Sequence, residues 1–366
     1  MDLYAFRILR SQPLRLALTV SGVALCIVLM LFLLSVYNGV ADGSVEYIRR
    51  NNADLWVLQR NAWNILRGSS LLSSGQADII RQIPDVKSAS AVLLQLSAIK
   101  KGDQVATVFL TGFDPAADLG GPPHLVEGRS VLADHEIVLD KAFAAKFRFK
   151  VGDAVQVQDH SMRVVGISSG TNAFVIQYAF VTLQRAQSLI PFPSIVTCIL
   201  VRSEGDRARV ADAIRRALPE VDVYDHERFL QNNIREMQSG LLPFLYTVAV
   251  IGAIVLTAIL SLLLSINILE RRKDFAILKT LGSPNGFLPR LIIKQALLIS
   301  SAASIAALVL FFPLCALIEK LSPEVSTKSS LGQIALALLV VGAMSLLSSL
   351  ISVRRLRRIY PLEAFS

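Results

Sequence analysis

The sequence predicts a membrane protein with four transmembrane helices and a large α+β extracytoplasmic domain inserted between helices 1 and 2. Three observations predict this fold class. The chain of 366 residues is 53% hydrophobic and only 18% charged, with a mean hydropathy of +0.53, which is too apolar for a soluble domain. Four long stretches contain no Asp, Glu, Lys or Arg. Most of the turn-forming residues and all four histidines lie between the first two of these stretches.

Each charge-free stretch is long enough to cross a bilayer. A central Lys, Arg or Asp costs roughly 3 kcal/mol, and about 20 apolar residues are needed to span the hydrocarbon core. The predicted transmembrane helices have 26, 33, 24 and 25 residues and run over Leu16–Ala41, Met237–Leu269, Gln295–Ile318 and Ser329–Val353. The second is longer than a span requires, so we expect its outer end, from about Met237, to continue as a stalk.

The distribution of basic residues predicts the orientation. Segments 1–15, 270–294 and 354–366 together hold 13 basic residues against four acids, which accounts for the whole net charge of +9. The inserted segment 42–236 and the short loop 319–328 are each balanced. By the positive-inside rule, both termini and the segment 270–294 are cytoplasmic, and the two balanced segments are external. The basic composition therefore reflects membrane topology, and no nucleic-acid partner is expected.

The N-terminal segment 1–15 has two open interpretations. Its apolar residues before Pro13 suit a short amphipathic helix at the membrane surface, or the plain cytoplasmic start of the first span. The first span is too long for the apolar region of a signal peptide, so we expect it to remain as an anchor.

The inserted segment 42–236 is expected to hold two similar β-α-β pieces, within 42–112 and 194–236, that pair into one α+β subdomain. In the first piece, a strand, a helix and a strand are predicted at Ala53–Leu58, Gln76–Ile83 and Val105–Leu110. In the second they are predicted at Ser194–Val201, Arg207–Leu218 and Val221–Tyr224. The ends of the two helices are alike, Asp78-Ile79-Ile80-Arg81 beside Asp212-Ala213-Ile214-Arg215.

Between these pieces, residues 113–193 are predicted to form a β-rich insertion, bounded by turns rich in Gly and Pro. Its strands are expected at Glu136–Leu139, Ala154–Gln158, Met162–Ile167 and Ala179–Thr182.

Several kinds of chemistry are disfavoured. The dipeptide Gly-Lys of a phosphate-binding Walker loop occurs nowhere, and the spans hold no ionisable residue for ion coupling or a pore. The energy for work across the membrane would therefore come from a partner. No catalytic, cofactor-binding or metal residues are predicted, since no nucleophile motif occurs and the histidines are widely spaced, at His124, His135, His160 and His226.

The stretch Glu270–Gly282 carries the clearest functional signal. Gly282 suits the left-handed position that ends a helix, and Ser283 followed by Pro284 suits the start of another. An ordinary positively charged inside loop is the simpler interpretation. Exposed apolar side chains within a charged rim better fit a helix that docks on an ATPase. The residues predicted to couple to the ATPase are Glu270, Arg271, Arg272, Asp274, Phe275, Ile277, Leu278, Lys279, Leu281 and Gly282.

This stretch matches the pattern E-R-x-(K/R)-(D/E)-apolar-(A/G)-I-x-(K/R)-x-(L/M)-G. Through this pattern the chain resembles the FtsX-like permeases of ABC transporters. These are the permeases of the MacB and lipoprotein-release type, also called type VII. The basic ending Arg354–Ala364 is similar to the end of that family. Segments of the large domain resemble the family's extracytoplasmic domain at Val126–Arg129, Glu136–Leu139, Lys150–Asp153 and Arg163–Ile167. The resemblance covers essentially the whole chain.

The resemblance implies a homodimer of four-span permeases in the bacterial inner membrane, in contact with lipid and bound to two copies of an ABC ATPase. MacB carries its ATPase fused, whereas this chain lacks one, so the ATPase would be a separate subunit. This chain would be non-catalytic and bind no cofactor itself, with ATP and Mg on the ATPase. A periplasmic adaptor (membrane fusion) protein is a further expected partner.

Two functions remain open. One is export or efflux of an antimicrobial, haem, a peptide or a lipoprotein. The other is signalling, in which the external domain activates a cell-wall hydrolase and nothing is transported. An external domain of about 195 residues with a β-rich insertion favours export.

Overall fold

The computed structural model describes residues 13–65, 70–102, 104–173, 176–192, 194–240, 242–270, 286–323, 325, 327 and 329–356. The chain forms two compact units. The helical unit comprises Met1–Asn38, Pro243–Leu317 and Thr327–Ser366, and the α+β unit comprises Gly39–Leu242 and Ile318–Ser326. Helix α2 (Pro13–Arg50) contributes residues to both units.

The helical unit is built from the first part of α2 together with α8 (Leu242–Glu270), α10 (Phe287–Leu321) and α11 (Leu331–Leu356). Small residues of α10 allow close helix packing, as expected inside a membrane, where there is little hydrophobic drive between helices. Its buried core joins α2, α10 and α11 through Val23, Ala24, Ile27, Leu31, Ala296, Ala303, Ala307, Phe311, Ala337 and Val341.

Three helices of the described chain are long and apolar enough to span a membrane: Leu16–Arg50, Pro289–Leu321 and Leu331–Ile351. The stretch predicted as the second span, 237–269, is divided between α7 (His226–Gly240) and α8. Helix α8 contributes a shorter apolar segment, Tyr246–Ile259. The count of four spans therefore stays a prediction. The first helix also continues nine residues beyond the predicted end of its span, since α2 ends at Arg50.

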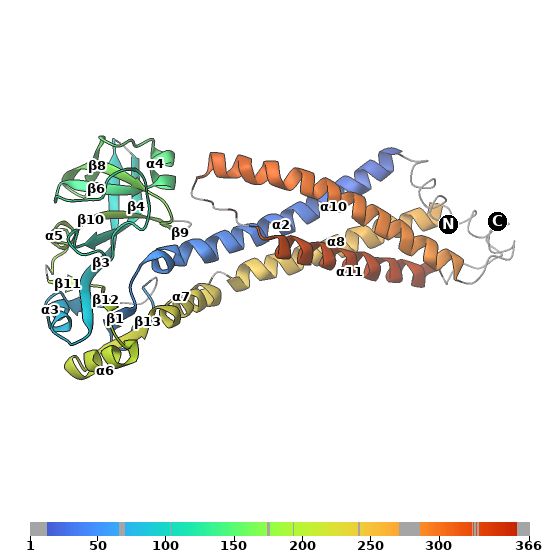
Figure 1. Cartoon of the computed structure of the whole chain (residues 1–366). Helices are drawn as coiled ribbons and strands as arrows, with labels where there is room; N and C mark the ends of the chain where they lie inside the picture. Colours follow the sequence, from blue (N-terminus) through green and yellow to red (C-terminus); the bar gives the residue numbers. More distant parts are fainter. Residues whose placement is uncertain are drawn as a thin grey trace, which may run out of the picture. The chain divides into compact units, whose positions relative to one another are not determined.

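The α+β unit contains a four-stranded antiparallel sheet in the order β13-β1-β12-β3. Two β-α-β pieces interleave in it: β1, helix α3 and β3 form one, and β12, helix α6 and β13 form the other (Figure 1). This arrangement is the split β-α-β fold, and we call it the split subdomain. The bounds are Leu55–Gln59 for β1, Gln76–Arg81 for α3, Val86–Lys101 for β3, Cys198–Ser203 for β12, Arg207–Ala217 for α6 and Val221–Asp225 for β13.

The two similar pieces lie side by side in this sheet, and one predicted strand differs. The second strand of the first piece is β3 and not the predicted Val105–Leu110, which belongs to β4 (Gln104–Phe113). Strand β3 is hard to recognise in the sequence, because its first part contains Ser88-Ala89-Ser90-Ala91, small residues with weak strand preference.

The second part of the α+β unit is a closed ring of strands, β3-β4-β10-β6-β8-β7, in which β7 pairs with both β8 and β3. Closure leaves no free sheet edge within the ring. Buried apolar side chains such as Val108, Leu139, Val155 and Val181 form a core for it. The bounds are Ile176–Thr182 for β10, Glu136–Asp140 for β6, His160–Ser168 for β8 and Ala154–Val157 for β7.

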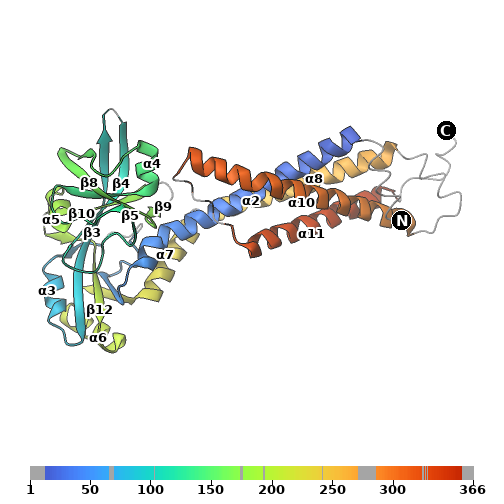
Figure 2. The same cartoon turned by 45° about the horizontal axis from the view of Figure 1, so that its top comes forward.

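Short elements complete this unit (Figure 2). They are β2 (Leu72–Ser73), β5 (Leu125–Gly128), α4 (Lys141–Phe147), β9 (Asn172–Ala173), α5 (Leu183–Ser188) and β11 (Ile195–Val196).

Strand β3 joins the ring to the split subdomain. Its first part, up to Val92, pairs with β12, and its second part, from Leu93, pairs with β4. The ring therefore includes β4 and half of β3, whereas the sequence predicts that all of residues 42–112 belong to the α+β subdomain. The boundary lies within β3 and not at residue 113.

Helices cover both faces of the split subdomain. Leu55 and Val57 of β1 lie in one core cluster with residues of α3 and α6. The alternate residues Trp56 and Leu58 lie in a second cluster with Phe229 of α7. Because side chains alternate across a strand, these clusters lie on opposite faces of the sheet.

Candidate functional site

The segment predicted to contact an ATPase lies almost wholly outside the described residues. Glu270 is the last residue of α8. The other predicted coupling residues lie outside the described chain: Arg271, Arg272, Asp274, Phe275, Ile277, Leu278, Lys279, Leu281 and Gly282. Their role in coupling remains a prediction.

The structure instead brings together a junction where α2 enters the α+β unit and α7 leaves it. The last turns of α2 and the first turns of α7 are packed in one buried core cluster with both the split subdomain and the ring. Its central members are Tyr47 and Ile48 of α2, Phe229 and Leu230 of α7, Trp56 and Leu200 of the split subdomain, and Tyr178 and Phe180 of the ring. We call this cluster the junction core.

Tyr47 connects α2 to the ring within the junction core. Its side chain is 1% exposed, and its ring stacks on Tyr178 with centroids 5.0 Å apart. Its hydroxyl donates a 2.8 Å hydrogen bond to the carbonyl oxygen of Gly120. A buried tyrosine whose hydroxyl is satisfied combines a large apolar contact with a directional one, so this contact fixes both position and rotation of the helix.

Helix α7 is attached to the split subdomain. Phe229 stacks on Trp56 with centroids 4.6 Å apart. Asn233 is fully buried, accepts a hydrogen bond from the backbone of Ile65 at 3.1 Å and donates to the carbonyl of Phe229 at 2.8 Å. The aromatic stack and the buried amide lie one turn apart on the same face of the helix. Helix α7 is therefore fixed at two successive turns.

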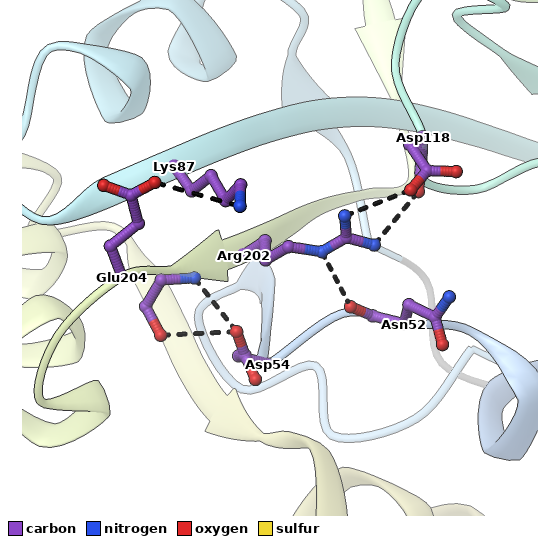
Figure 3. Close-up of polar contacts among 7 residues, drawn as sticks. Asn52, Asp54, Lys87, Asp118, Arg202 and Glu204 are labelled. Atoms are coloured by element: carbon purple, nitrogen blue, oxygen red, sulfur yellow. Dashed lines mark hydrogen bonds and ion pairs between the residues drawn. The ribbon is translucent and has the colours of Figure 1, made fainter.

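The linker between α2 and β1, residues 51–54, borders a polar surface hollow of about 700 Å³. Figure 3 shows Arg202 between Asn52 and Asp118. Its Nε donates to the carbonyl oxygen of Asn52 at 3.3 Å, and its Nη1 lies 3.1 Å from Asp118 Oδ2. Arg202 thus ties the linker to the end of β12.

Asp54 holds the other end of the linker. Its Oδ2 accepts hydrogen bonds from the backbone nitrogen and the hydroxyl of Ser203, at 3.0 and 3.3 Å (Figure 3). Its Oδ1 lies 2.6 Å from Arg207 Nη2. Its carbonyl oxygen accepts a 3.0 Å bond from the backbone nitrogen of His226, the first residue of α7. The exit of α2 and the start of α7 are therefore joined through one residue.

This arrangement suits mechanical connection. Among the described residues, no three His, Cys, Asp or Glu side chains are placed to hold a metal ion. The thiol of Cys198 lies in the junction core, where burial raises its pKa to about 12, so it is a poor nucleophile. Packed aromatic rings and satisfied buried amides stiffen a junction, because any displacement breaks several contacts together.

The junction residues are not among those that the sequence predicts to be functional. Two signals for them were present: Gly39 and Gly43 near the end of the first apolar stretch, and apolar Phe229, Leu230 and Ile234 at helical spacing before the second. Neither signal says which strand or ring the helix would contact, because those partners are distant in sequence.

Comparisons with known proteins cover both units. The model of the MacB-like periplasmic core domain matches residues 16–217, more than half of the chain, and that of the FtsX-like permease C-terminal matches residues 246–361. An uncharacterized ABC transporter permease of Mycobacterium tuberculosis, Rv0072, is 24% identical over 368 residues, covering 99% of this chain and 98% of the relative.

A second relative, the uncharacterized ABC transporter permease Mb2592 of Mycobacterium bovis, is 23% identical over 362 residues, with 99% and 98% covered. The crystal structure of the periplasmic region of MacB from Actinobacillus actinomycetemcomitans matches 50% of this chain and 94% of its own length, with 16% identity and a TM-score of 0.41. The resemblance noted in the sequence is confirmed by the two domain models: this chain belongs to the family of ABC transporter permeases that combine a MacB-like periplasmic core domain with an FtsX-like permease C-terminal domain.

Proposed function

We propose that this chain is the permease subunit of an ABC exporter, in which a separate ATPase subunit drives movement of the α+β unit outside the membrane. The observation that carries the proposal is the junction core, in which both helices that connect the α+β unit to the rest of the chain are buried together. A unit held by flexible loops would absorb helix movement. A unit whose core contains both helices must move or deform with them.

Energy enters this scheme on the cytoplasmic side. The segment Glu270–Gly282 begins at the last residue of helix α8, so an ATPase bound there would act on the helix that follows α7 in the chain. The permease would work as a homodimer with two ATPase subunits, in the inner membrane of a bacterium, with both termini cytoplasmic. Cargo would be handled by the external domains and an adaptor protein, because the predicted spans contain no charged residue for a polar conduit.

The test is ATP hydrolysis by the ATPase that co-purifies with this chain, measured with and without the permease in lipid nanodiscs. Leu278→Asp places a charge in the predicted apolar contact and should abolish the stimulation, without lowering the amount of permease in the membrane. Leu96→Asp is the matched control, since Leu96 lies 58% exposed on the ring. Hydrolysis that Leu278→Asp leaves unchanged would contradict the predicted docking site.

A further inference from the structure

One face of the outer part of α2 lies along the ring. Gly43, Tyr47 and Arg50 follow one another at intervals of four and three residues, so they share a side of the helix. Gly43 faces the carbonyl oxygen of Asn172, and Arg50 covers Gly170. Together with the stacking of Tyr47 on Tyr178, these contacts join α2 to the segment of the ring that leads from the end of β8 into β10.

Gly43 makes the closest of these approaches. A Cβ added at this position would lie 2.5 Å from the carbonyl oxygen of Asn172, a separation that real side chains essentially never show. Glycine inside a helix costs about 1 kcal/mol relative to alanine. Here that cost is offset by direct contact between the helix backbone and the ring backbone, with no side chain between them.

The two connecting helices share the junction core but differ in their other contacts. Helix α2 contacts the ring through Gly43, Tyr47 and Arg50. The stacking contact of α7 is with Trp56 of the split subdomain, and its buried-amide contact is with Ile65, in the segment that follows β1. A movement of α2 that breaks the contacts it shares with α7 in the junction core would then carry the ring with it, relative to the split subdomain.

We propose that Gly43 is a positioning residue for coupling. Because it has no side chain, the ring backbone contacts α2 directly, so that ATP turnover displaces the ring relative to the split subdomain. This inference rests on the proposed function. The backbone contact at Gly43 positions the ring on the helix, and Tyr47 contacts the ring from the same face of the helix one turn further on. The ring is then the moving part that acts on cargo or on an adaptor.

The test compares Gly43→Ala with Gly22→Ala in the complex with the ATPase. Both substitutions add the same methyl group to the same helix and gain the same helix preference, but nothing lies within 4 Å of a Cβ at Gly22. Spin labels are placed at two exposed positions, Gln156 of the ring and Arg209 of α6, the latter with 84% of its side chain exposed. Cys26 and Cys315 are replaced by alanine, and the buried thiol of Cys198 stays unlabelled.

The distance between the labels is measured without nucleotide and with ATP and vanadate. Wild type and Gly22→Ala should show a nucleotide-dependent change, and Gly43→Ala should lose it while its hydrolysis stays within about two-fold of wild type. Tyr47→Phe, which keeps the stack and removes only the hydroxyl contact with Gly120, should reduce the change and provides a second variant if Gly43→Ala unfolds.

An unaltered distance change in Gly43→Ala would overturn the inference, as would a wild-type complex that hydrolyses ATP under permease stimulation with no distance change. A wild-type permease that stimulates no ATPase would instead contradict the proposed function. The two failures are thereby distinguished.

Discussion

Arg215 Nη2 donates a 2.7 Å hydrogen bond to the carbonyl oxygen of Val223, eight residues further along the chain. In the other β-α-β piece, Arg81 Nε makes the equivalent 2.8 Å bond to the carbonyl oxygen of Ala89, again eight residues on. Each arginine also pairs with the aspartate three residues before it. The repeat visible in the sequence therefore has a common structural role, because the last turn of each helix carries an arginine that donates to a carbonyl of the outer strand of its own piece.

Removing one of these bonds should weaken the split subdomain. Arg215→Met keeps the length and apolar stem of the side chain but leaves the Val223 carbonyl without its charged donor, at a cost of about 1–2 kcal/mol. The melting temperature of the α+β unit should fall by roughly 2–4 °C per kcal/mol. Arg209→Met, at a largely exposed position of the same helix, is the control and should melt like wild type. Identical melting temperatures of the two variants would show that the hydrogen bond from Arg215 to Val223 does not stabilise the fold.

The ion pair between Arg129 and Glu136 should give the α+β unit a defined acid sensitivity. The Arg129 guanidinium, helped by backbone N–H groups of Leu132 and Ala133, lowers the pKa of Glu136 from 4.5 to about 2. Because the folded pKa lies below the unfolded one, the pair stabilises fully above about pH 4.5, and this stabilisation is lost as the pH falls toward 2. Glu136→Gln should therefore melt at a lower temperature at neutral pH.

The same variant should also show a flatter pH dependence of melting between pH 4.5 and 2. Melting scans of wild type and variant at matched salt measure this directly. An equal slope in the two proteins would mean that Glu136 does not carry the acid sensitivity.

The buried amide of α7 should be needed for attachment of that helix. Asn233→Leu removes the acceptor for the Ile65 backbone N–H and leaves a buried donor unpaired, which costs about 1–3 kcal/mol. We expect faster hydrogen exchange at Ile65 and in α7. Gln231→Leu is the control, because Gln231 is exposed and bonds only at the surface with Glu227. Exchange that is unchanged in Asn233→Leu would rule out an anchoring role.

The orientation of the chain can be tested with a thiol probe that does not cross membranes. In a background without Cys26 and Cys315, the probe should label Arg209→Cys in intact cells, because the α+β unit is predicted to be external. It should label Ser283→Cys only after the membrane is opened. Burial keeps the pKa of the Cys198 thiol at about 12, so this residue should contribute no background. The reverse labelling would overturn the orientation.

Local patterns predicted much of the fold. Most strands and helices of the α+β unit appear within a few residues of their expected positions, because branched residues, prolines and helical spacing act over short distances. Strand β3 was missed, since its serines and alanines carry no strong preference and its conformation depends on β12 and β4, which are distant in sequence. Closure of the ring could not be predicted for the same reason, because it depends on the pairing of β7 with β3, which is distant in sequence.

Of the two candidate functional regions, only one could be predicted from the sequence. The motif Glu270–Gly282 could be found because its residues are contiguous. The junction core could not, because Tyr47, Trp56, Tyr178 and Phe229 meet only in the folded chain. In sequence Gly43 is an ordinary helix-weakening glycine, and only the nearby Asn172 carbonyl oxygen shows why a side chain does not fit there.

A separate ATPase is proposed to drive this permease. Affinity purification of the chain from its own membranes after mild cross-linking, followed by mass spectrometry of the retained proteins, tests it most directly. Export predicts an ABC ATPase together with an adaptor protein, whereas a cell-wall hydrolase in place of the adaptor would favour signalling. Recovery of the permease with no ATPase would rule out a separate ATPase subunit as its energy source.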